Sequence, residues 1–582
     1  MSGARRLALR WAVPGYALAL AFAVTAPLLA PGYLLLRDAV STPRSYLSDS
    51  ALGLGGVAPR AVPQDFAVAA LSAVIDGGVV VKGLLIAALA LAGWGAARLA
   101  AQIVGEAGLA GQFVAATVAI WNPYVAERLL QGHWSLLLGY GCLPWVAAAV
   151  LRLRTGPPGA ADWAALVGWT ALAGLTPTGL ILAAIVGLAC VTVPGAGAAR
   201  LRCAAAVMTT AVLAASPWLL ASALGATLGD AQSAGVAPFA ARAEPGLGTV
   251  GALAGLGGLW NAEAVPATRT TLFALGATLV LLTVVILGIA ALRHSASARP
   301  LLLLAMVGVL APAAMATGPG LSVLRAIVDA AGGLAVLRDG QKWVALAMPG
   351  YSVAAAASVL TMRHRIRPVA WAVTCCVALI AVLPDLAWGV GGKVRPVQYP
   401  PAWERVAVHI NADPQPVLVL PAESMRQFGW SGPEPVLDPL PRWVRAEVLS
   451  TGDLLVGGQT VPGEGNRARA AQQVLLSGAD PALLAGAGVG WVVMETGTPG
   501  TTGSAAKTLS RLPLVYRDDD LALYRAGGTS PGATPGTRLA MIGAHLLWAG
   551  MLLGAAAVAA VQSLRRPCRR TVQSERRPCR RS

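Results

Sequence analysis

Charged residues are scarce in this sequence. Only 12% of the 582 residues are charged, whereas 56% are hydrophobic and the mean hydropathy is +0.64. A soluble domain carries roughly 25% charged residues, so this composition excludes an ordinary soluble fold. Uncharged apolar runs long enough to cross a bilayer recur from end to end, and such runs form transmembrane helices. The sequence therefore predicts a polytopic α-helical membrane protein.

Lysine is rarer still, and nearly all of the positive charge is arginine. The chain has four lysines, at positions 82, 342, 393 and 507, and a net charge of +17. A charge of this size is also typical of nucleic-acid-binding proteins. Here, however, the arginines gather in short segments between the apolar runs, which is a membrane topology signal. We therefore expect no nucleic-acid partner.

The polar segment 395–525 has no cysteine, and the whole sequence lacks several common catalytic motifs. None of the seven cysteines falls in the polar segment 395–525, so this segment has no disulfide and must hold its own core. No spacing is that of a structural zinc site. The sequence has no P-loop, Rossmann fingerprint, HExxH or GxSxG motif, so ATP hydrolysis, nicotinamide chemistry and zinc proteolysis are not supported.

Twelve apolar runs are predicted to be membrane spans. They are residues 11–33, 78–99, 108–123, 134–151, 161–175, 177–194, 203–223, 270–292, 300–317, 343–362, 368–388 and 538–562. The first is longer than the roughly 7–15 apolar residues of a signal peptide, so we expect a retained span. Thr176 and Pro177 make only a short break between the fifth and sixth, which leaves open one kinked helix with a re-entrant piece.

Arginines mark every second loop between these runs. With the N-terminus inside, all of the arginine-rich loops fall on the inner side, which satisfies the positive-inside rule. We therefore predict a multi-pass plasma-membrane protein with both termini in the cytoplasm. Its tail, with RRPCRR twice, is expected to contact anionic membrane lipid. The outer segments, which hold nearly all the acidic residues, are 34–77, 122–133, 224–269, 318–342 and 389–537.

The last outer segment has the pattern of a folded domain. Short runs at 416–422, 490–495 and 520–525 are typical of strands, and two helical patterns lie between them. They predict a small extracytoplasmic α/β domain. The predicted division is 1–390 for the multi-span transmembrane domain with its outer loops, 391–530 for the α/β domain, 538–562 for the last transmembrane helix and 563–582 for a basic cytoplasmic tail.

Three outer segments carry residues suited to chemistry. Directly after the first span, Arg37 and Asp38 lie at the outer membrane boundary. A carboxylate that faces lipid is costly, so Asp38 is expected to face a cavity or to pair with Arg37. The first alternative makes Asp38 a general base for an acceptor hydroxyl. The second makes it an interfacial ion pair that ends a helix.

The second segment is NPYVAERLLQGHW, residues 122–134, which we predict to form one or two helical turns at the interface. Adjacent residues on a helix point in different directions, so Glu127 and Arg128 need not be partners. Arg128 and His133 are then available to an anion, and the planar fork of arginine suits phosphate. The alternative is an interfacial anchor with Trp134 in the aromatic belt.

The third segment is VLRDGQKW, residues 336–343, at the outer end of the tenth span. Two cations here, Arg338 and Lys342, lie on the predicted outer side, against the positive-inside rule, so a local interaction is expected to hold them there. One such interaction is with an anionic lipid headgroup. The other is a salt bridge from these cations to Asp339 or Asp38. In the α/β domain, Trp403, Trp430 and Trp443 suit either sugar stacking or a hydrophobic core.

Taken together, these motifs resemble the GT-C superfamily of membrane glycosyltransferases. The layout of spans and outer loops over residues 1–390, with an acidic residue early in the first loop, is similar to that of the superfamily. Closer similarity is to large actinobacterial membrane proteins with NPYVAERLLQGHWSLLLGY-like and LRDGQKW-like segments, which are YfhO-like relatives. The resemblance differs in one respect, because Asp38 stands alone where many members have paired acids.

The resemblance implies an activity and a site. The donor is a sugar on a polyprenyl phosphate, with arabinose or mannose expected, and the acceptor is a cell-envelope glycan or glycolipid on the outer face. Asp38 is the candidate base. The candidate substrate-binding residues are Arg37, Glu127, Arg128, His133, Arg338, Asp339 and Lys342. No residue is assigned to a metal and no cofactor is required, although a divalent metal stays open, as does the oligomeric state.

Two other functions remain open from the sequence. A lipid or polysaccharide transporter also has many spans, but it often has internal repeats and ionisable residues within spans, and neither is evident here. A non-catalytic scaffold for envelope assembly, with a degenerate GT-C fold, has nearly the same sequence pattern. Convergence of Asp38, Arg128 and Lys342 on one outward cavity favours an enzyme.

Overall fold

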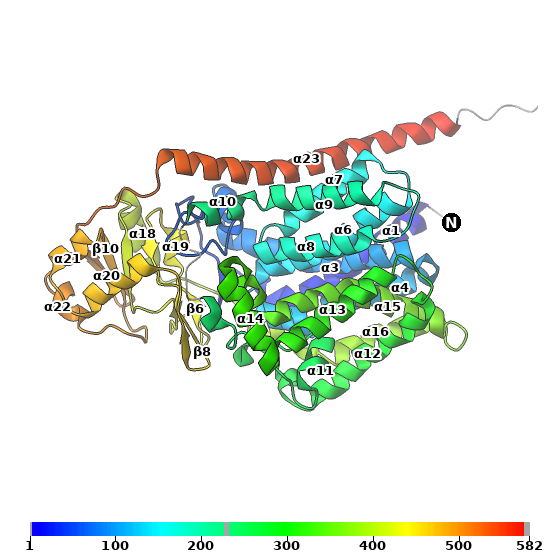
Figure 1. Cartoon of the computed structure of the whole chain (residues 1–582), viewed down its shortest axis with the longest axis horizontal. Coiled ribbons are helices and arrows are strands. Elements are labelled where there is room, and N and C mark those ends of the chain that lie inside the picture. Colours follow the sequence, from blue (N-terminus) through cyan, green and yellow to red (C-terminus); the bar gives the residue numbers. More distant parts are fainter. Residues whose placement is uncertain (1–2, 226–231, 575–582) are drawn as a thin grey trace, which may run out of the picture.

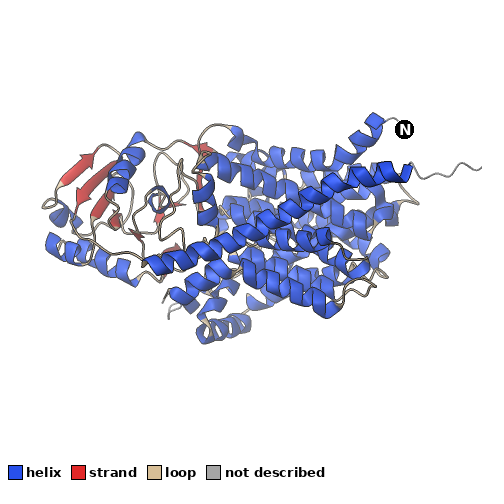
Figure 2. Ribbon diagram, turned by 90° about the horizontal axis from the view of Figure 1, so that it is seen from above, coloured by secondary structure: helices blue, strands red, loops and turns tan. Residues whose placement is uncertain are grey.

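The computed structural model describes residues 3–225 and 232–574. Long helices lie side by side in the larger part of the molecule, and a smaller part with the strands lies at one end (Figure 1). Seen from above, the strands are gathered at the end opposite the N-terminus (Figure 2). The chain is therefore a helical body with an α/β domain attached to one end.

The helical body contains eighteen of the helices. They are α1 (Gly3–Thr25), α2 (Gln64–Leu71), α3 (Gly77–Ile103), α4 (Gly108–Ile120), α5 (Pro123–Leu130), α6 (Trp134–Thr155), α7 (Ala160–Ala173), α8 (Pro177–Val191), α9 (Arg200–Ala214), α10 (Ser216–Leu224), α11 (Gly248–Ala254), α12 (Phe273–Leu292), α13 (Arg299–Met315), α14 (Gly318–Ala330), α15 (Ala347–Met362), α16 (Pro368–Ala381), α17 (Ala387–Gly392) and α23 (Pro535–Ser574).

Each of the twelve predicted spans contains helix, but the number of twelve spans is not confirmed and stays a prediction. Within the described residues, six helices are long and apolar enough to cross a membrane, and nine if each of three bent pairs is one span. The bends are 53° between α9 and α10, 93° between α13 and α14, and 75° after α16. Thr176 caps α8 by accepting a bond from the Gly179 amide at 3.1 Å, so α7 and α8 are separate helices.

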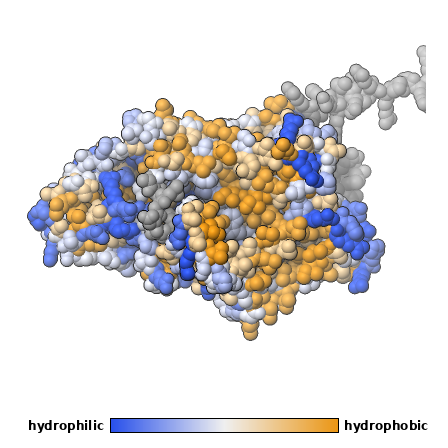
Figure 3. All heavy atoms as spheres, viewed as in Figure 1, coloured by the Kyte–Doolittle hydropathy of each residue, from blue (hydrophilic) through white to orange (hydrophobic). Residues whose placement is uncertain are grey.

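Small residues set the close packing of these helices. A Cβ added at Gly141 of α6 would lie 2.5 Å from the Ala88 carbonyl oxygen of α3, and one at Gly288 of α12 would overlap the backbone of Ala354 in α15. Glycine thus lets helix backbones approach, which is how membrane helices commonly associate. The outer surface of this body is hydrophobic, between hydrophilic ends (Figure 3). Exposed Leu279, Ile286 and Leu303 belong to that surface.

The long helix α23 runs along the outside of the helical body, from the α/β end toward the end where the N-terminus lies (Figures 1 and 2). Its first turn is tied to the first outer loop, because Arg538 donates to both oxygens of Asp49 at 2.6 and 2.8 Å. The boundaries of the predicted last span and basic tail stay a prediction, and the tail beyond Ser574 lies outside the described residues.

The α/β domain is built on a five-stranded sheet with the order β11-β12-β10-β4-β7. Its strands are β4 (Val417–Leu420), β7 (Val448–Leu449), β10 (Trp491–Glu495), β11 (Leu514–Arg517) and β12 (Leu521–Arg525). The strands β4, β7 and β10 are parallel, and β12 is antiparallel to both β10 and β11. Three of these strands lie where the sequence predicts them, so the small sheet region near the C-terminus is confirmed.

Both faces of this sheet are covered. The helices are α18 (Pro401–Ala412), α19 (Leu440–Trp443), α20 (Asn466–Leu476), α21 (Pro481–Gly486) and α22 (Ala505–Leu509), and two short hairpins are β5–β6 (Met425–Arg426 with Val436–Leu437) and β8–β9 (Leu454–Val456 with Gln459–Val461). Along β4, Val417 and Val419 face one core while Leu418 and Leu420 face the other. This alternation is the period of two expected of a strand buried on both faces.

The first outer loop belongs structurally to this domain as well as to the helices. Its strand β1 (Tyr33–Leu36) pairs with β2 (Ala39–Val40) and with β3 (Pro396–Val397), at the start of the domain. Leu35 and Val40 are part of the same core as Val417 and Val419. The turn between β1 and β2, which carries Arg37 and Asp38, is thus held between the two parts of the molecule.

Candidate functional site

The short helix α5 positions the first half of the site. Asn122 caps it by accepting a bond from the Val125 amide at 3.1 Å, and Pro123 occupies the first helical position, where no amide hydrogen is needed. All eight residues of α5 are buried, so the helix predicted for the interface lies inside the protein. Arg128 stands in its last turn and His133 just beyond its end.

A glycine brings the first outer loop against this helix. Gly132 has a φ of +81°, and a Cβ there would overlap the backbone of Leu36 and Ala39. The Asp38 amide donates to the Gln131 carbonyl at 3.2 Å across the same contact. Only glycine permits this approach, which places Asp38 beside His133.

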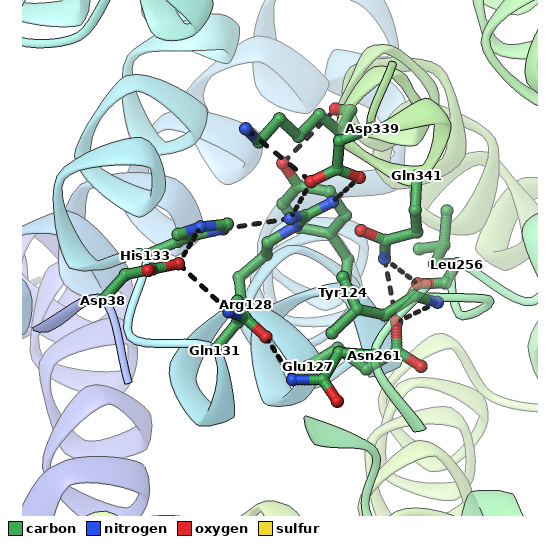
Figure 4. Close-up of polar contacts among 12 residues, drawn as sticks. Asp38, Tyr124, Glu127, Arg128, Gln131, His133, Leu256, Asn261, Asp339 and Gln341 are labelled. Carbon is green, nitrogen blue, oxygen red and sulfur yellow. Dashed lines mark hydrogen bonds and ion pairs between the residues drawn. The ribbon is translucent and has the colours of Figure 1, made fainter. Parts of the chain in front are cut away.

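Five charged or titratable side chains form one chain of contacts (Figure 4). Asp38 Oδ2 lies 2.9 Å from His133 Nε2, and His133 Nδ1 lies 2.9 Å from Arg128 Nη1. Arg128 also donates to both oxygens of Asp339, at 2.8 and 2.9 Å. Lys342 Nζ completes the chain at 3.7 Å from Asp339 Oδ2.

The chain of contacts fixes the tautomer of His133. A guanidinium can only donate hydrogen bonds, so His133 Nδ1 must accept from Arg128 with its lone pair. The proton of the neutral imidazole is therefore on Nε2, which donates to Asp38. A doubly protonated ring would turn an N–H group toward Arg128, so the arrangement requires neutral His133.

The electrostatics agree with an ionised Asp38 beside a neutral His133. Burial by itself would raise the pKa of Asp38, but the hydrogen bonds from His133 and Gln131 hold that pKa below its usual value. Burial, and then the charge of Arg128, lowers the pKa of His133 against the opposing effect of Asp38. For Asp339, burial is outweighed by the charges of Arg128 and Lys342, so its pKa is also lowered.

A second layer of side chains holds Asp38. Gln131 donates to Asp38 Oδ2 at 3.0 Å, and Asn261 donates to Gln131 Oε1 at 2.8 Å (Figure 4). Both bonds to Asp38 therefore end on Oδ2, and Oδ1 has no hydrogen bond from the described residues. Gln131 was not among the predicted site residues, although it lies in the segment 122–134 from which Arg128 and His133 were predicted.

Glu127 does not take part in this site. Its side chain is fully buried, and its Oε2 accepts bonds from the Leu259 amide at 3.1 Å and from Gln341 at 3.0 Å. It neither orients Arg128 and His133 nor reaches the cavity. The predicted substrate-binding role is replaced by a contact that holds the 256–259 loop and residue 341 together.

Arg37 is also engaged within the protein. Its side chain donates to the Leu130 carbonyl at 2.8 Å, to the Glu263 carbonyl at 3.2 Å and to the Glu434 carboxylate. Its backbone, with a φ of +48°, exchanges hydrogen bonds with Pro435 and Leu437. Arg37 therefore ties the membrane part to the α/β domain, and it does not pair with Asp38.

A cavity of about 2010 Å³ lies between the helical body and the α/β domain. Its polar wall combines residues from both parts: Arg37, Asp38, Gln131, His133, Asn261, Arg338, Asp339 and Lys342 from the first, and Ser424, Arg426, Asp438 and Arg442 from the second. The side chain of Asp38 is 35% exposed and that of Lys342 is 24% exposed. Arg128 is fully buried, so it acts on the cavity through His133 and Asp339.

Two further groups of predicted residues have structural roles. Arg338 lies in the cavity wall, where its guanidinium stacks over Phe239 and its Nε donates to the Ala335 carbonyl at 3.1 Å. The tryptophans of the α/β domain pack into its core: Trp403 and Trp443 are stacked 6.1 Å apart and buried. Of the two alternatives for these aromatics, the core is the observed one.

Metal ligands do not gather in this site. Over residues 3–225 and 232–574, no group of three or more His, Cys, Asp and Glu side chains is arranged to hold a metal ion. Asp49, the next acid after Asp38 in the first outer loop, is paired with Arg538. The residues of this cavity therefore do not form a protein-only metal site.

Fold and site together define a helical protein with several helices suited to crossing a membrane and a large cavity, with charged side chains in its wall, beside an α/β domain. No protein-family model and no curated protein matches the chain. Its structure is similar to that of the archaeal oligosaccharyltransferase AglB from Archaeoglobus fulgidus, solved with an inhibitory peptide and a dolichol-phosphate. The TM-score is 0.40 and the identity 10%, over 83% of this chain and 69% of that chain.

Oligosaccharyl transfer is the activity of AglB, and the GT-C resemblance of this chain comes from its own sequence motifs. The actinobacterial and YfhO-like part of the resemblance stays a prediction.

Proposed function

We propose that this protein is a membrane glycosyltransferase that moves a sugar from a polyprenyl-phosphate donor to a cell-envelope glycan or glycolipid on the outer face of the membrane. The observation that supports it is the position of Asp38. One of its oxygens is held by His133 and Gln131, and the carboxylate faces a cavity whose wall also carries Lys342. A base and a cation on one cavity suit attack of a hydroxyl on a phosphate-activated sugar.

The transfer step uses Asp38 as the base. The acceptor hydroxyl oxygen forms a bond to the anomeric carbon, while the bond from that carbon to the phosphate oxygen breaks. The phosphate leaves with the electron pair, and the hydroxyl proton passes to Asp38. The hydroxyl becomes strongly acidic only as its new bond forms, so a carboxylate whose pKa is held low still accepts the proton late in the step.

Lys342 is the proposed contact for the departing phosphate. Its ammonium is partly exposed to the cavity, and Asp339 lies 3.7 Å away and keeps it in place. Arg128, which was a candidate for this role, donates from Nη1 and Nη2 to both oxygens of Asp339 and from Nη1 to His133, and its side chain is fully buried. We therefore assign Arg128 to positioning: it orients His133 and fixes Asp339, rather than binding substrate.

An apolar part of the same cavity suits the lipid of the donor. Pro177 and Ile181 of α8, with Trp218 and Leu219 of α10, form a hydrophobic stretch of its wall. These helices belong to the helical body, whose surface is largely hydrophobic in the view of Figure 3. A polyprenyl chain there would leave its phosphate toward Lys342. Because polyprenyl phosphate is already a leaving group, the lack of a nucleotide motif is expected.

The first test is transfer from radiolabelled polyprenyl-phosphate arabinose and polyprenyl-phosphate mannose, assayed in parallel in membranes that contain the protein. Replacing Asp38→Asn removes the base, so we expect transfer to fall about 10²- to 10⁴-fold. Asp49→Asn is the matched control, because Asp49 lies in the same loop but binds Arg538 and not the cavity.

Each outcome of this test decides something. Loss of transfer in Asp38→Asn alone supports the enzyme and its base. Equal transfer in all three proteins keeps a glycosyltransferase and rejects Asp38 as the base. If neither donor yields product while a known transferase works in the same membranes, the enzyme is rejected in favour of an assembly scaffold or a transporter.

A further inference from the structure

Unpaired polar atoms gather on the α/β side of the cavity, away from Asp38. Arg426 lines the cavity with a side chain that is only 4% exposed. Its Nε donates to Glu495 at 2.5 Å, and its Nη2 lies 3.7 Å from Asp438, but its Nη1 has no partner among the described residues. The hydroxyl of Ser424, which also lines the cavity, and Oε1 of Glu495 are likewise buried without partners there.

Buried polar atoms without partners are costly and rare, so a cluster of them calls for an explanation. A purely structural ion cluster accounts for the contacts of Arg426 with Glu495 and Asp438. It does not account for Ser424, whose hydroxyl contributes no hydrogen bond to the fold within the described residues. A ligand that supplies the missing partners explains both residues.

The position of the cluster supports a ligand site. Ser424 follows β4, and Glu495 is the last residue of the parallel strand β10. Ser450 and Gly452, which follow the parallel strand β7, line the same part of the cavity. Open α/β sheets bind ligands outside the carboxyl ends of their parallel strands, and the cluster lies at that edge.

The charge of the cluster favours a neutral ligand. Arg426 is balanced by Asp438. Glu495 is a second carboxyl against the same guanidinium, and burial raises its pKa to about 8 despite the opposing charge of Arg426. Glu423 lies beside the cluster and accepts a bond from the Thr501 amide at 2.8 Å. There is no surplus positive charge for a phosphate or carboxylate, whereas hydroxyl groups match the N–H and O–H groups on offer.

The cluster and Asp38 are close enough to share one extended ligand. Val436 of β6 bridges to Arg37 on one side and pairs with Arg426 on the other. Adjacent strands lie about 4.8 Å apart, so the backbone of Arg426 is roughly 10 Å from that of Arg37, the neighbour of Asp38. The cavity, at about 2010 Å³, is larger than the roughly 300–1,000 Å³ that encloses one drug-sized ligand.

We propose that Ser424 and Arg426 form a binding subsite for a neutral oligosaccharide at the carboxyl edge of the α/β sheet. The subsite binds an interior part of the glycan while its terminal hydroxyl reaches Asp38. Its assignment to the acceptor rests on the proposed transferase function, but the binding of a neutral glycan does not.

The test is binding of two neutral probes, mannotriose and arabinotriose, to the full chain in lipid nanodiscs without donor. Inorganic phosphate serves as the anionic probe. Ser424→Ala removes one hydroxyl and Arg426→Lys keeps the charge but removes the unpaired guanidinium N–H. Each loses about one hydrogen bond to the ligand, so we expect affinity to fall about threefold to tenfold. Ser477→Ala, on the exposed end of α20, is the control.

A readout of stability separates binding from folding. Ser424→Ala breaks no hydrogen bond of the fold, so its thermal unfolding should match that of the unchanged protein while its glycan affinity falls. In the transfer assay, the same variant should raise the acceptor KM and leave kcat nearly unchanged, whereas Asp38→Asn should lower kcat and leave glycan binding intact.

The two proposals can fail separately. Glycan binding that Ser424→Ala weakens, in a protein without transferase activity, keeps the subsite and rejects the transferase. Transfer with an acceptor KM that neither Ser424→Ala nor Arg426→Lys changes rejects the subsite and keeps the transferase. Failure of both neutral probes to bind, or displacement of them by phosphate, overturns the neutral-glycan assignment.

Discussion

His133 is the residue through which the buried charges of the site act on Asp38. It accepts a hydrogen bond from Arg128 and donates one to Asp38, and both bonds are 2.9 Å long. Because Arg128 is itself fixed by two bonds to Asp339, the imidazole has little freedom to rotate or to change its tautomer. A carboxylate with such a neighbour keeps one orientation and stays ionised.

This arrangement predicts the pH dependence of the proposed transfer reaction. In the unchanged protein the pKa of Asp38 is lowered, so activity should persist as pH falls, until Asp38 becomes protonated below its usual range of about 4. His133→Ala removes a hydrogen-bond donor that lowers this pKa, while the burial that raises it remains. The acid limb of the kcat/KM profile should therefore move to higher pH.

His133→Gln is the conservative comparison, since a glutamine amide still offers an N–H group to Asp38. It should restore much of the lost acid range. An acid limb that is the same in all three proteins would show that His133 does not act through Asp38, even if both variants lose activity.

Single residues also show what the sequence can and cannot predict about the site. Asp38, Asp339 and Lys342 carry scarce charges at the ends of apolar runs, and His133 is one of only five histidines. All four side chains line one cavity. The pairing of Arg128 with Asp339 joins residues 211 positions apart, so no local spacing reveals that Arg128 is already neutralised.

At the scale of elements, the site depends on two short pieces, α5 and the β1–β2 turn, that meet at Gly132. The positive φ of this glycine and the overlap that a Cβ would make with Leu36 and Ala39 are separate constraints. The first concerns the backbone of residue 132 alone. The second concerns the distance between the two pieces, and hence the contact of Asp38 with His133.

Gly132→Ala is therefore predicted to be more harmful than an alanine at a glycine with only the first constraint. Gly527 is the matched control, with a φ of +83° and no atom within 4 Å of an added Cβ. Backbone strain should lower the free energy of unfolding of Gly527→Ala by about 1 kcal/mol. In Gly132→Ala the added Cβ also overlaps the backbone of Leu36 and Ala39. The loss in free energy of unfolding should therefore be roughly 2–4 kcal/mol, and the rate of transfer should fall at least tenfold.

Thermal unfolding and transfer assays on these two glycine variants provide the measurement. Equal loss of stability in Gly132→Ala and Gly527→Ala would mean that strain alone matters, and that the turn can move away from α5 without penalty.

Elements differ in how well the sequence predicts them. The strands at 416–422, 490–495 and 520–525 are short apolar runs with turn residues on both sides, and each forms near its predicted place. The count of spans is less predictable, because hydropathy does not report a bend. The 53° bend between α9 and α10 lies inside the predicted span 203–223. The 93° break between α13 and α14, in contrast, falls at the predicted end of the ninth span, where Thr317 caps α14.

At the scale of the whole molecule, the α/β domain and the beginning of α23 lie at one end of the helical body (Figure 1). The cavity is lined by residues of that domain and of the helical body. The arginine pattern predicts that this end faces outward and that both chain termini are cytoplasmic. Donor and acceptor would then meet outside the cell membrane.

Cysteine labelling in intact cells checks this orientation. In a background with Cys568→Ser and Cys579→Ser, Gln459→Cys in the exposed β8–β9 hairpin should react with a membrane-impermeant maleimide. Arg365→Cys, in the exposed loop after α15, should react only after the cells are permeabilised. The reverse pattern would place the cavity in the cytoplasm and contradict the proposed outer-face reaction.

The pairing of β1 with β3 also has a consequence for the order of events during synthesis of the protein. Strand β1 is among the first segments that a ribosome makes, but its partner at Pro396 follows only after every helix of the body except α23 has been made. The salt bridge of the buried Arg37 likewise cannot form until Glu434 has been made. During synthesis the first loop must therefore stay open until the α/β domain has been made, so the cavity closes as one of the last events of biogenesis. A chain that ends before Pro396 lacks these contacts.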